Sequence, residues 1–465
     1  MDIASQWRAR LERDLWGSVM PFWANHSGDA AHGGFFNCLD EDGVVYDTTK
    51  HIWLQGRQCW MYARLCSEYS DAAFSALVAA HPGPLPSAAA AGGPASPAPL
   101  TRASLLAQAE RGVDFLLRHA VASDGQSVYF AVTREGVPAL AQRKPFSAAF
   151  LILALGELAV ATGKPAYRAQ ALQWLDKYFA WCNAPGGSGA ALGKPGLPGA
   201  PALLPLNEPM IALNLIMELC RGLPREEALG FYAGERERAV AAVLAHASME
   251  HRAVFEGMPA SGVPDLSTPA GRLLNPGHAI EAGWFLLDVA AFVGDAALRG
   301  RALEIIDWAW EGGWDGELAR GTQSPAAAGL GKPAREAAAG GAGQGAGGGS
   351  GGMVYFRDAC GFSPTQLEAH SKLWWPQAEA MVAFSKAYAA TGREDYLQKF
   401  DAVATWTYEH LVTDKEWYGY CDRTGAVTHR VRLLCCCVCA RARVLRLCFF
   451  FFFLTRPLLF FTFPA

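Results

Sequence analysis

Three stretches of the chain place charged side chains inside otherwise apolar, helix-like sequence. In the first stretch, residues 50–60, Arg57 follows Trp53 by four residues. Four residues make about one helical turn, so the two side chains should share one face. Because the window is rich in large apolar residues, we expect this face to line a pocket, where Arg57 would offer a charged hydrogen-bond donor. An ordinary solvated arginine is the alternative.

The second stretch, residues 275–287, begins as a loop and continues as an apolar helix. Asn-Pro-Gly at 275–277 favours a turn, so we expect the helix to begin at about His278. Glu281 lies three residues further on, which makes it a neighbour of His278 at the helix mouth. A carboxylate beside a histidine fixes its tautomer and raises its basicity, as a general base near neutral pH requires. A histidine that only caps the helix remains the alternative.

The third stretch, residues 372–381, carries a carboxylate in an apolar helix. Pro376 suits a first helical turn, which places Glu379 about one turn in. Such a carboxylate either anchors a neighbouring loop or lines a pocket. The adjacent Trp374 and Trp375 favour a pocket, because the C–H faces of sugars pack well on aromatic rings.

Two other candidate motifs, a phosphate-binding loop and a metal site, do not match the patterns that these functions require. Residues 188–195 lack the glycine and the Ser or Thr of a phosphate-binding loop. His26, His32, Cys38 and His51 lack metal-ligand spacing, so no metal is predicted. A net charge of −4 gives no reason to expect nucleic acid or an anionic membrane as partner. The N-terminus does not resemble a secretory signal, and the scattered cysteines suggest reduced thiols and a cytoplasmic location.

A repeated glycine shows how these stretches are positioned. Gly163, Gly294 and Gly392 each end an apolar run, and a second run with helical spacing follows each of them. Glycine is the residue a helix C-cap favours, so the repeating unit is a helix, a short glycine turn and a second helix. The apolar runs before the three glycines cover residues 151–160, 282–292 and 380–389.

Short β-hairpins are predicted between the helix pairs, at residues 34–46, 128–136, 353–358 and 418–425, where aromatic and apolar residues flank turn signals. The fold class is therefore all-α, with helical hairpins and β-decorated loops closing into a toroid. An open α-solenoid is the alternative, since solenoid repeats also stack helix pairs.

The chain is expected to form one domain over residues 1–429. Low-complexity segments near 81–100, 184–204 and 319–352 lack apolar periodicity, so we interpret them as flexible surface insertions. Residues 430–465 change abruptly to a Cys- and Phe-rich composition without helical or strand pattern. Arg456 and Pro457 split this tail into runs shorter than the ~20 apolar residues a membrane span needs. A frameshift or intron read-through in the gene sequence explains it best.

The chemical stretches, taken in order, resemble the N-acylglucosamine 2-epimerase family, also called renin-binding protein. The similarity runs from about Trp7 to about His429 and is interrupted by the low-complexity segments. Its motifs are long and specific. They include Trp53-Leu-Gln-Gly-Arg57-Gln58, Asn275-Pro-Gly-His278 and Lys372-Leu-Trp-Trp-Pro376.

The resemblance implies an (α/α)6 barrel, commonly a homodimer, that interconverts N-acyl-D-glucosamine and N-acyl-D-mannosamine. It requires no cofactor, although ATP or another nucleotide acts in several members as an allosteric effector. Carried over to matching positions, the catalytic residues are His278, Glu379 and Arg57. The substrate-binding residues are Trp53, Glu281 and Trp375.

The implied mechanism uses two acid/base histidines on opposite faces of the sugar C2. One is His278. The second belongs to a motif ending Phe-His-x-Pro-Arg, and this chain has no histidine after His429. Its activity is therefore expected to be impaired.

Two alternatives stay open. A related aldose–ketose isomerase or disaccharide 2-epimerase would usually carry an extra histidine at residues 206–211, which is absent here. A non-catalytic sugar- or nucleotide-binding homologue is the other.

Overall fold

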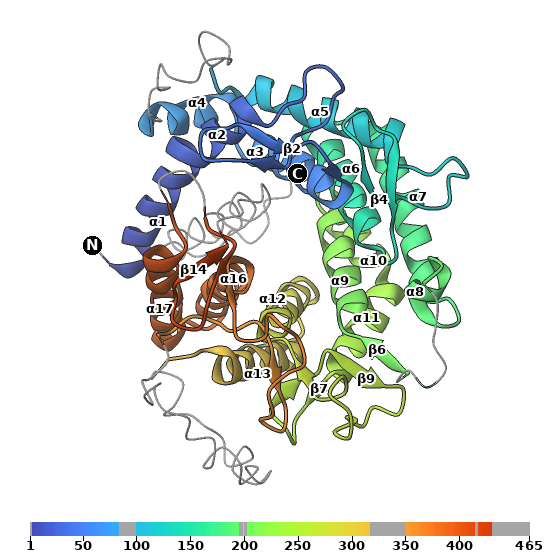
Figure 1. The fold of residues 1–465 in the computed structure, drawn as a ribbon, viewed down its shortest axis with the longest axis vertical. Helices are drawn as coiled ribbons and strands as arrows, with labels where there is room; N and C mark the ends of the chain where they lie inside the picture. The colour runs from blue at the N-terminus through green and yellow to red at the C-terminus, as the bar shows by residue number, and fades with distance from the viewer. Residues whose placement is uncertain are drawn as a thin grey trace.

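The computed structural model describes residues 2–82, 99–194, 199, 202–316, 350–413 and 417–429. Within these residues most of the chain is helical, and the helices form a ring (Figure 1). The inner helices are α3 (Ile52–Glu68), α6 (Phe146–Thr162), α9 (Asn207–Leu219), α12 (Pro276–Val293) and α16 (Trp374–Thr391).

Consecutive inner helices pack against one another from α3 to α16, and each packs against an outer helix. The inner helices α3, α6, α12 and α16 bury residues on nearly all sides, as expected for a helix surrounded by others. The outer layer consists of α1 (Ile3–Asp14), the π-helical turn η1 (Leu15–Val19), α2 (Met20–His26), α5 (Arg102–His119), α7 (Pro165–Cys182), α11 (Ala233–Ala245), α13 (Ala296–Gly313) and α17 (Glu394–His410). Shorter helices are α4 (Asp71–Ala80), α8 (Gly187–Ala191) and α10 (Arg225–Gly230).

The outer layer closes on itself, because α1 and α17 lie side by side (Figure 1). Trp7 Nε1 donates to Asp401 Oδ1 at 2.7 Å, and the Tyr408 hydroxyl donates to the Asp14 carboxylate. The Arg10 guanidinium lies 4.0 Å from the centroid of the Tyr408 ring. A closed ring confirms the predicted toroid and excludes the open solenoid.

The predicted glycine turns are confirmed. Gly163, Gly294 and Gly392 cap α6, α12 and α16 with φ of 68°, 78° and 68°. This left-handed region strains residues with a Cβ atom, so glycine ends these three inner helices and lets the following outer helix run back along each of them.

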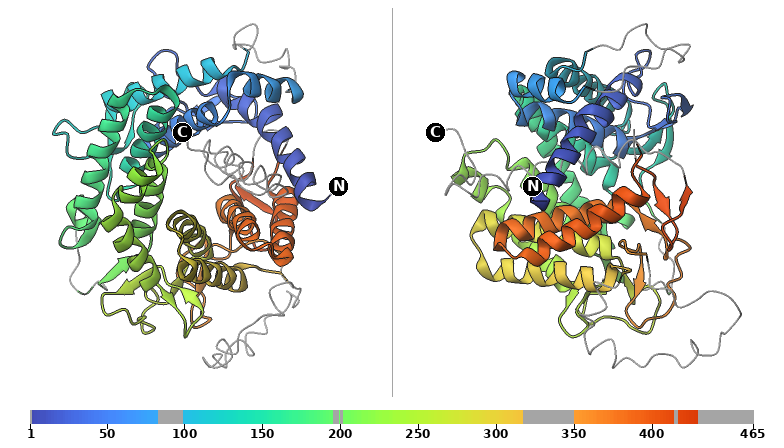
Figure 2. Two further views of the ribbon diagram at one scale, coloured as in Figure 1. Left: turned by 180° about the vertical axis from the view of Figure 1, so that it is seen from behind. Right: turned by 90° about the vertical axis from the view of Figure 1, so that its left-hand side faces the viewer.

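Short antiparallel strand pairs gather at one end of the ring (Figure 2, right). Several lead directly into inner helices: β3 into α3, β10 into α12 and β12 into α16. The pairs and triplets are β1 (Cys38–Leu39) with β2 (Val45–Asp47), β3 (Lys50–His51) with β4 (Tyr129–Val132) and β5 (Pro138–Ala141), β6 (Leu203–Pro205) with β9 (Gly257–Pro259), β7 (Ala247–Ser248) with β8 (Ala253–Val254), β10 (Leu273–Leu274) with β11 (Arg357–Asp358), and β12 (Lys372–Leu373) with β13 (Tyr420–Cys421) and β14 (Val427–His429).

Three of the four predicted hairpins are confirmed, as β1–β2, β4–β5 and β13–β14. The prediction for residues 353–358 is wrong. Strand β11 pairs instead with the distant β10, where Leu274 lies opposite Arg357. Met353 forms an isolated bridge with Trp314. These residues therefore link distant segments.

A buried lysine holds the start of α3. Lys50 is fully buried, and its Nζ donates to the Asp29 carboxylate at 2.9 Å. It also donates to the carbonyls of Gly33 at 2.6 Å and Arg134 at 2.9 Å. The Arg134 guanidinium completes the cluster by binding both oxygens of Asp29.

The same cluster recurs at the start of α16. Lys372 is fully buried, lies 3.3 Å from the Asp315 carboxylate, and donates to the Arg423 carbonyl at 2.7 Å and to Ser350 Oγ at 2.9 Å. The Arg423 guanidinium again binds both oxygens of the aspartate. The segments that lead into α3 and α16 are therefore structural repeats.

The repeat continues into the helices. The Gln55 side chain bonds both the amide and the carbonyl of Phe35, at 2.8 and 2.7 Å. Gln377 bonds both groups of Met353, each at 2.8 Å. Counted from the buried lysine, the equivalent positions are Lys50 and Lys372, Trp53 and Trp375, Gln55 and Gln377, and Arg57 and Glu379.

Only parts of the predicted low-complexity segments lie within the described residues. Residues 83–98 and 317–349 lie outside the described residues. The predicted aberrant tail, residues 430–465, also lies outside them. The segment 184–204 is not irregular throughout, because it contains α8 and part of β6. Arg143 also fixes it by donating to the carbonyls of Leu192 and Gly193 at 3.1 and 2.8 Å.

The third segment ends earlier than predicted. Gly351 and Gly352 are buried, and a Cβ atom at Gly352 would lie 2.7 Å from the Trp406 ring. The Gly351 amide donates to the Asp315 carbonyl at 3.0 Å, as the Gly33 amide donates to Asp29 at 2.8 Å. The insertion therefore leaves and rejoins the fold at a closed turn. Among the described helices, none combines the length and apolar character that crossing a bilayer demands.

Replacing residues 316–349 by Ala-Ala, the pair found at positions 30–31 of the first repeat, should preserve folding. Each halving of a loop lowers its closure cost by about 0.6 kcal/mol, so the melting temperature should stay the same or rise by a few degrees. Thermal unfolding followed by circular dichroism measures this. The same shortened chain with Gly352→Ala is the control and should be destabilised. Loss of folding in the shortened chain that keeps Gly352 would contradict the assignment of the closed turn.

Candidate active site

His278 lies at the start of α12 and is fixed through both its backbone and its ring. The Asn275 side chain caps the helix by accepting from the His278 amide at 3.1 Å. His278 Nδ1 lies 2.7 Å from Glu256 Oε1, and the two side chains are 25% and 16% exposed. The predicted helix start is confirmed within two residues. The expected hydrogen-bond partner, Glu281, is replaced by Glu256 from the loop between β8 and β9.

The charges around His278 set its basicity. Burial alone would lower the pKa of His278, but the charge and hydrogen bond of Glu256 outweigh it. The Glu281 charge adds to this effect, and the charge of Lys144 opposes it. The net result is a pKa above the ordinary value of 6.5. Glu281 is therefore an electrostatic neighbour of His278, as expected, but Glu256 has the larger effect.

Trp375 covers the imidazole of His278. The two ring centroids are 5.1 Å apart with an interplanar angle of 37°. Tyr355 meets the Trp375 ring edge-on, at 5.8 Å and 87°. A Cβ atom at Gly277 would lie 2.5 Å from the Trp375 ring, so glycine is needed for this close approach. The aromatic residues give the histidine an apolar wall on one side.

Glu379 joins this group through α12. Its Oε2 accepts from Trp284 Nε1 at 2.9 Å. Trp284 is nearly buried, and Lys386 Nζ lies 5.2 Å from its ring centroid. Glu379 itself is partly exposed. The hydrogen bond from Trp284 orients one oxygen of the Glu379 carboxylate.

Arg57 and Trp53 form a second group where α3 meets α6. The Arg57 guanidinium lies 5.6 Å from the Trp53 ring and 4.5 Å from the Phe150 ring. The shared face of Arg57 and Trp53 is thereby confirmed. Lys144, which precedes α6, acts electrostatically on His278, so the N-terminal ends of α6 and α12 belong to the same end of the barrel. A guanidinium against two aromatic rings is held as a fixed cation.

The residues missed by sequence reasoning are Glu256 and Tyr355. Both stand in short strand-like segments that are distant from α12 and α16 in sequence. Glu256 is a single carboxylate inside the apolar run Val254-Phe-Glu-Gly-Met258, and this was the one available signal. No helical spacing could have joined it to His278.

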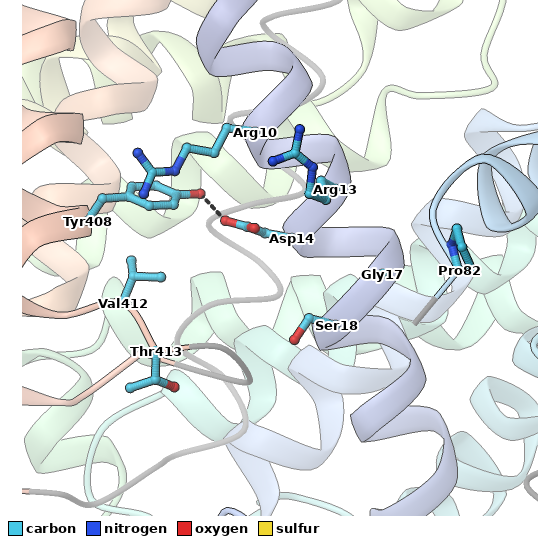
Figure 3. Close-up of a pocket in the computed structure, with 9 residues that line it drawn as sticks. All are labelled: Arg10, Arg13, Asp14, Gly17, Ser18, Pro82, Tyr408, Val412 and Thr413. Atoms are coloured by element: carbon cyan, nitrogen blue, oxygen red, sulfur yellow. Dashed lines mark hydrogen bonds between the residues drawn. The ribbon is translucent and has the colours of Figure 1, made fainter. Parts of the chain in front are cut away.

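A separate cavity of about 340 Å³ opens at the seam between α1, η1 and α17 (Figure 3). Arg10, Arg13, Ser18 and Tyr408 are among the residues that line it. None of the predicted site residues lines this cavity, so we do not assign the chemistry to it. Within the described ranges, no cluster of three or more His, Cys, Asp or Glu side chains suits a metal ion.

Comparison with known proteins gives consistent results. The N-acylglucosamine 2-epimerase (GlcNAc 2-epimerase) family model matches residues 98–323 and 317–433. The N-acylglucosamine 2-epimerase of Bos taurus is 36% identical over 431 residues, covering 92% of this chain and 86% of that protein. That of Homo sapiens is 35% identical over 430 residues, covering 92% and 85%.

Solved structures share the fold at low sequence identity. Cellobiose 2-epimerase from Bacillus thermoamylovorans superposes with a TM-score of 0.68 at 16% identity, covering 95% of this chain and 99% of that one. A D-mannose isomerase gives 0.66 at 17%, covering 95% and 97%. These likenesses confirm the fold class, a mainly helical (α/α)6 barrel with short β-hairpins.

Gly277→Ala should disturb the group around His278 without unfolding the protein. The new Cβ atom would clash with the Trp375 ring, so the binding of any ligand held by this group should weaken at least tenfold, by roughly 1.4 kcal/mol. Titration with an N-acyl amino sugar measures this. Gly300→Ala on α13 is the matched control, since its Cβ would meet no atom within 4 Å. Equal binding by both variants would remove Trp375 from the site.

Proposed function

The chain belongs to the N-acylglucosamine 2-epimerase family, an isomerase family, and we propose that it interconverts N-acyl-D-glucosamine and N-acyl-D-mannosamine. The observation that carries this proposal is the His278–Glu256 pair at the start of α12. With Nδ1 bonded to Glu256 at 2.7 Å, Nε2 is the ring nitrogen left for a substrate.

The proposed reaction moves one proton at C2. In the open-chain sugar, C2 lies beside the C1 carbonyl, which makes its proton acidic. Nε2 of His278 removes this proton, and the electron pair passes to the carbonyl oxygen to give an enolate that carries the N-acylamino group on C2. A proton then returns to C2 on the opposite face and inverts it. No oxidant or cofactor is consumed, and the atoms balance.

The other predicted residues have supporting roles in this proposal. Arg57 would supply the cation that stabilises the developing oxyanion. Trp375 and Trp53 supply apolar rings for the C–H faces of the sugar. Glu379 and Glu281 offer acceptors for sugar hydroxyls. The support for these roles is that all five side chains project from the first two turns of inner helices.

Inversion at C2 requires a second proton-transferring group on the opposite face of the sugar. The family resemblance places a second histidine after the last hairpin, and the sequence contains none beyond His429. We therefore propose that a chain with this C-terminus is impaired in inversion. A non-catalytic sugar-binding homologue is the second candidate, and the same missing histidine favours it.

The related reactions are less well supported. An aldose–ketose isomerase or disaccharide 2-epimerase would be expected to carry a further histidine near the start of α9, where this chain has Leu206-Asn-Glu-Pro-Met-Ile211. A homodimer, a nucleotide such as ATP as allosteric effector, and a cytoplasmic location also remain proposals that rest on the family resemblance.

His278→Ala should abolish exchange of the C2 proton with solvent. The test uses a version whose C-terminus is restored to the family ending, with N-acetylmannosamine in deuterium oxide followed by proton NMR. General bases contribute about 10²- to 10⁴-fold, so exchange should fall by at least that range. His251→Ala is the matched control, because His251 bonds Ser248 in the β7–β8 turn. Exchange at the parent rate in His278→Ala would remove this histidine from the mechanism.

Arg57→Ala in the same restored version should lower kcat/KM through loss of a charged donor. The expected cost is about 2–4 kcal/mol of transition-state stabilisation. Steady-state epimerisation measures it, with the melting temperature as a check on folding. A change smaller than about tenfold would make Arg57 a structural residue.

A further inference from the structure

We infer that Glu256 is the positioning residue of the site, holding the proton of neutral His278 on Nδ1 so that Nε2 keeps its lone pair for C2. This inference rests on the proposed function for its catalytic part. Its structural part, the tautomer and orientation of His278, can be tested without any activity.

The backbone of Glu256 links the N-terminal ends of two inner helices. Its amide donates to the Leu273 carbonyl at 3.0 Å, and its carbonyl accepts from the Leu206 amide at 3.0 Å. Leu273 belongs to β10, which leads into α12, and Leu206 immediately precedes α9. The carboxylate is therefore placed by the same strands that start the helix carrying His278.

The residues on either side of Glu256 leave it little freedom. Phe255 is fully buried, bridges Leu274, and has its carbonyl 2.8 Å from His246 Nδ1. A Cβ atom at Gly257 would lie 3.0 Å from the Leu203 side chain. A carboxylate fixed on such a rigid segment can orient an imidazole without first being ordered itself.

The chemistry follows from the single N–H of a neutral imidazole. An ionised carboxylate can only accept, so the bond at 2.7 Å requires the proton to be on His278 Nδ1. Nε2 is then unprotonated and able to take a proton. When it does so, the resulting imidazolium is stabilised by the adjacent Glu256 charge. The Trp375 ring, tilted by 37° with its centroid 5.1 Å away, limits rotation of the imidazole.

Two carboxylates flank His278, and they should differ in effect. Glu256 acts by hydrogen bond and charge, whereas Glu281 contributes through its charge, and Lys144 opposes both. A base must be neutral to act, so the rate should fall as the pH drops through the pKa of His278. Because Glu256 raises this pKa, its removal should move the acid limb of the pH profile to lower pH.

The experiment compares Glu256→Gln with Glu281→Gln in the full chain. First, ¹⁵N NMR of labelled histidine reports the tautomer and titration of His278. The unaltered protein should show Nδ1–H above its pKa. Glu256→Gln should give a mixture of tautomers and a lower pKa, whereas Glu281→Gln should keep the tautomer with a smaller shift. An unchanged tautomer in Glu256→Gln, or equal changes in both variants, would overturn the inference.

Second, C2 exchange is measured for both variants in the restored version. Loss of a residue that orients a reactive side chain typically costs about 10- to 100-fold, so kcat should fall in this range with little change in KM. The acid limb of the pH profile of Glu256→Gln should shift to lower pH. If the NMR result holds but the parent shows no exchange, the proposed function fails while the positioning role stands. A parent-like kcat in Glu256→Gln would refute the catalytic part.

Discussion

Buried lysines at the strand ends fix where two inner helices join the barrel. Taking an ammonium and a carboxylate out of water costs several kcal/mol per ion, and mutual attraction offsets this only when the remaining hydrogen bonds are satisfied. Lys50 meets this condition with three acceptors, Asp29 and two backbone carbonyls. Lys372 meets it in the same way around Asp315. Each lysine therefore holds a glycine turn, a hairpin and a helix start in one arrangement.

This constraint carries over to the candidate site. Because α3 and α16 start alike, Arg57 and Glu379 occupy equivalent positions and differ in charge. The start of α12 is built differently, with Asn275 as the cap and Glu256 on the adjoining strands. In our account the duplicated helix starts supply Arg57 and Glu379, and the distinct start of α12 supplies the base together with Glu281.

Sequence reasoning succeeded where local rules decide the structure. The glycine caps, three hairpins, the shared face of Arg57 and Trp53 and the start of α12 all follow from spacing within one turn or one helix. It failed where contacts are distant in sequence. Helical spacing pointed to Glu281, but a strand pairing brings Glu256 to His278. The expected hairpin at 353–358 pairs across to β10, and the long insertion after Asp315 hid the repeat of the two lysine clusters.

The central proposal is that His278 acts as one positioned base in this chain and that no second histidine base accompanies it. The most direct test incubates the 465-residue protein separately with N-acetylglucosamine and N-acetylmannosamine in deuterium oxide, and follows C2 by NMR. We predict deuterium incorporation into one epimer without inversion, or no reaction, and epimerisation at least about 10²-fold slower than in a version with the restored ending. Full-rate interconversion by the chain with its present C-terminus would contradict the account.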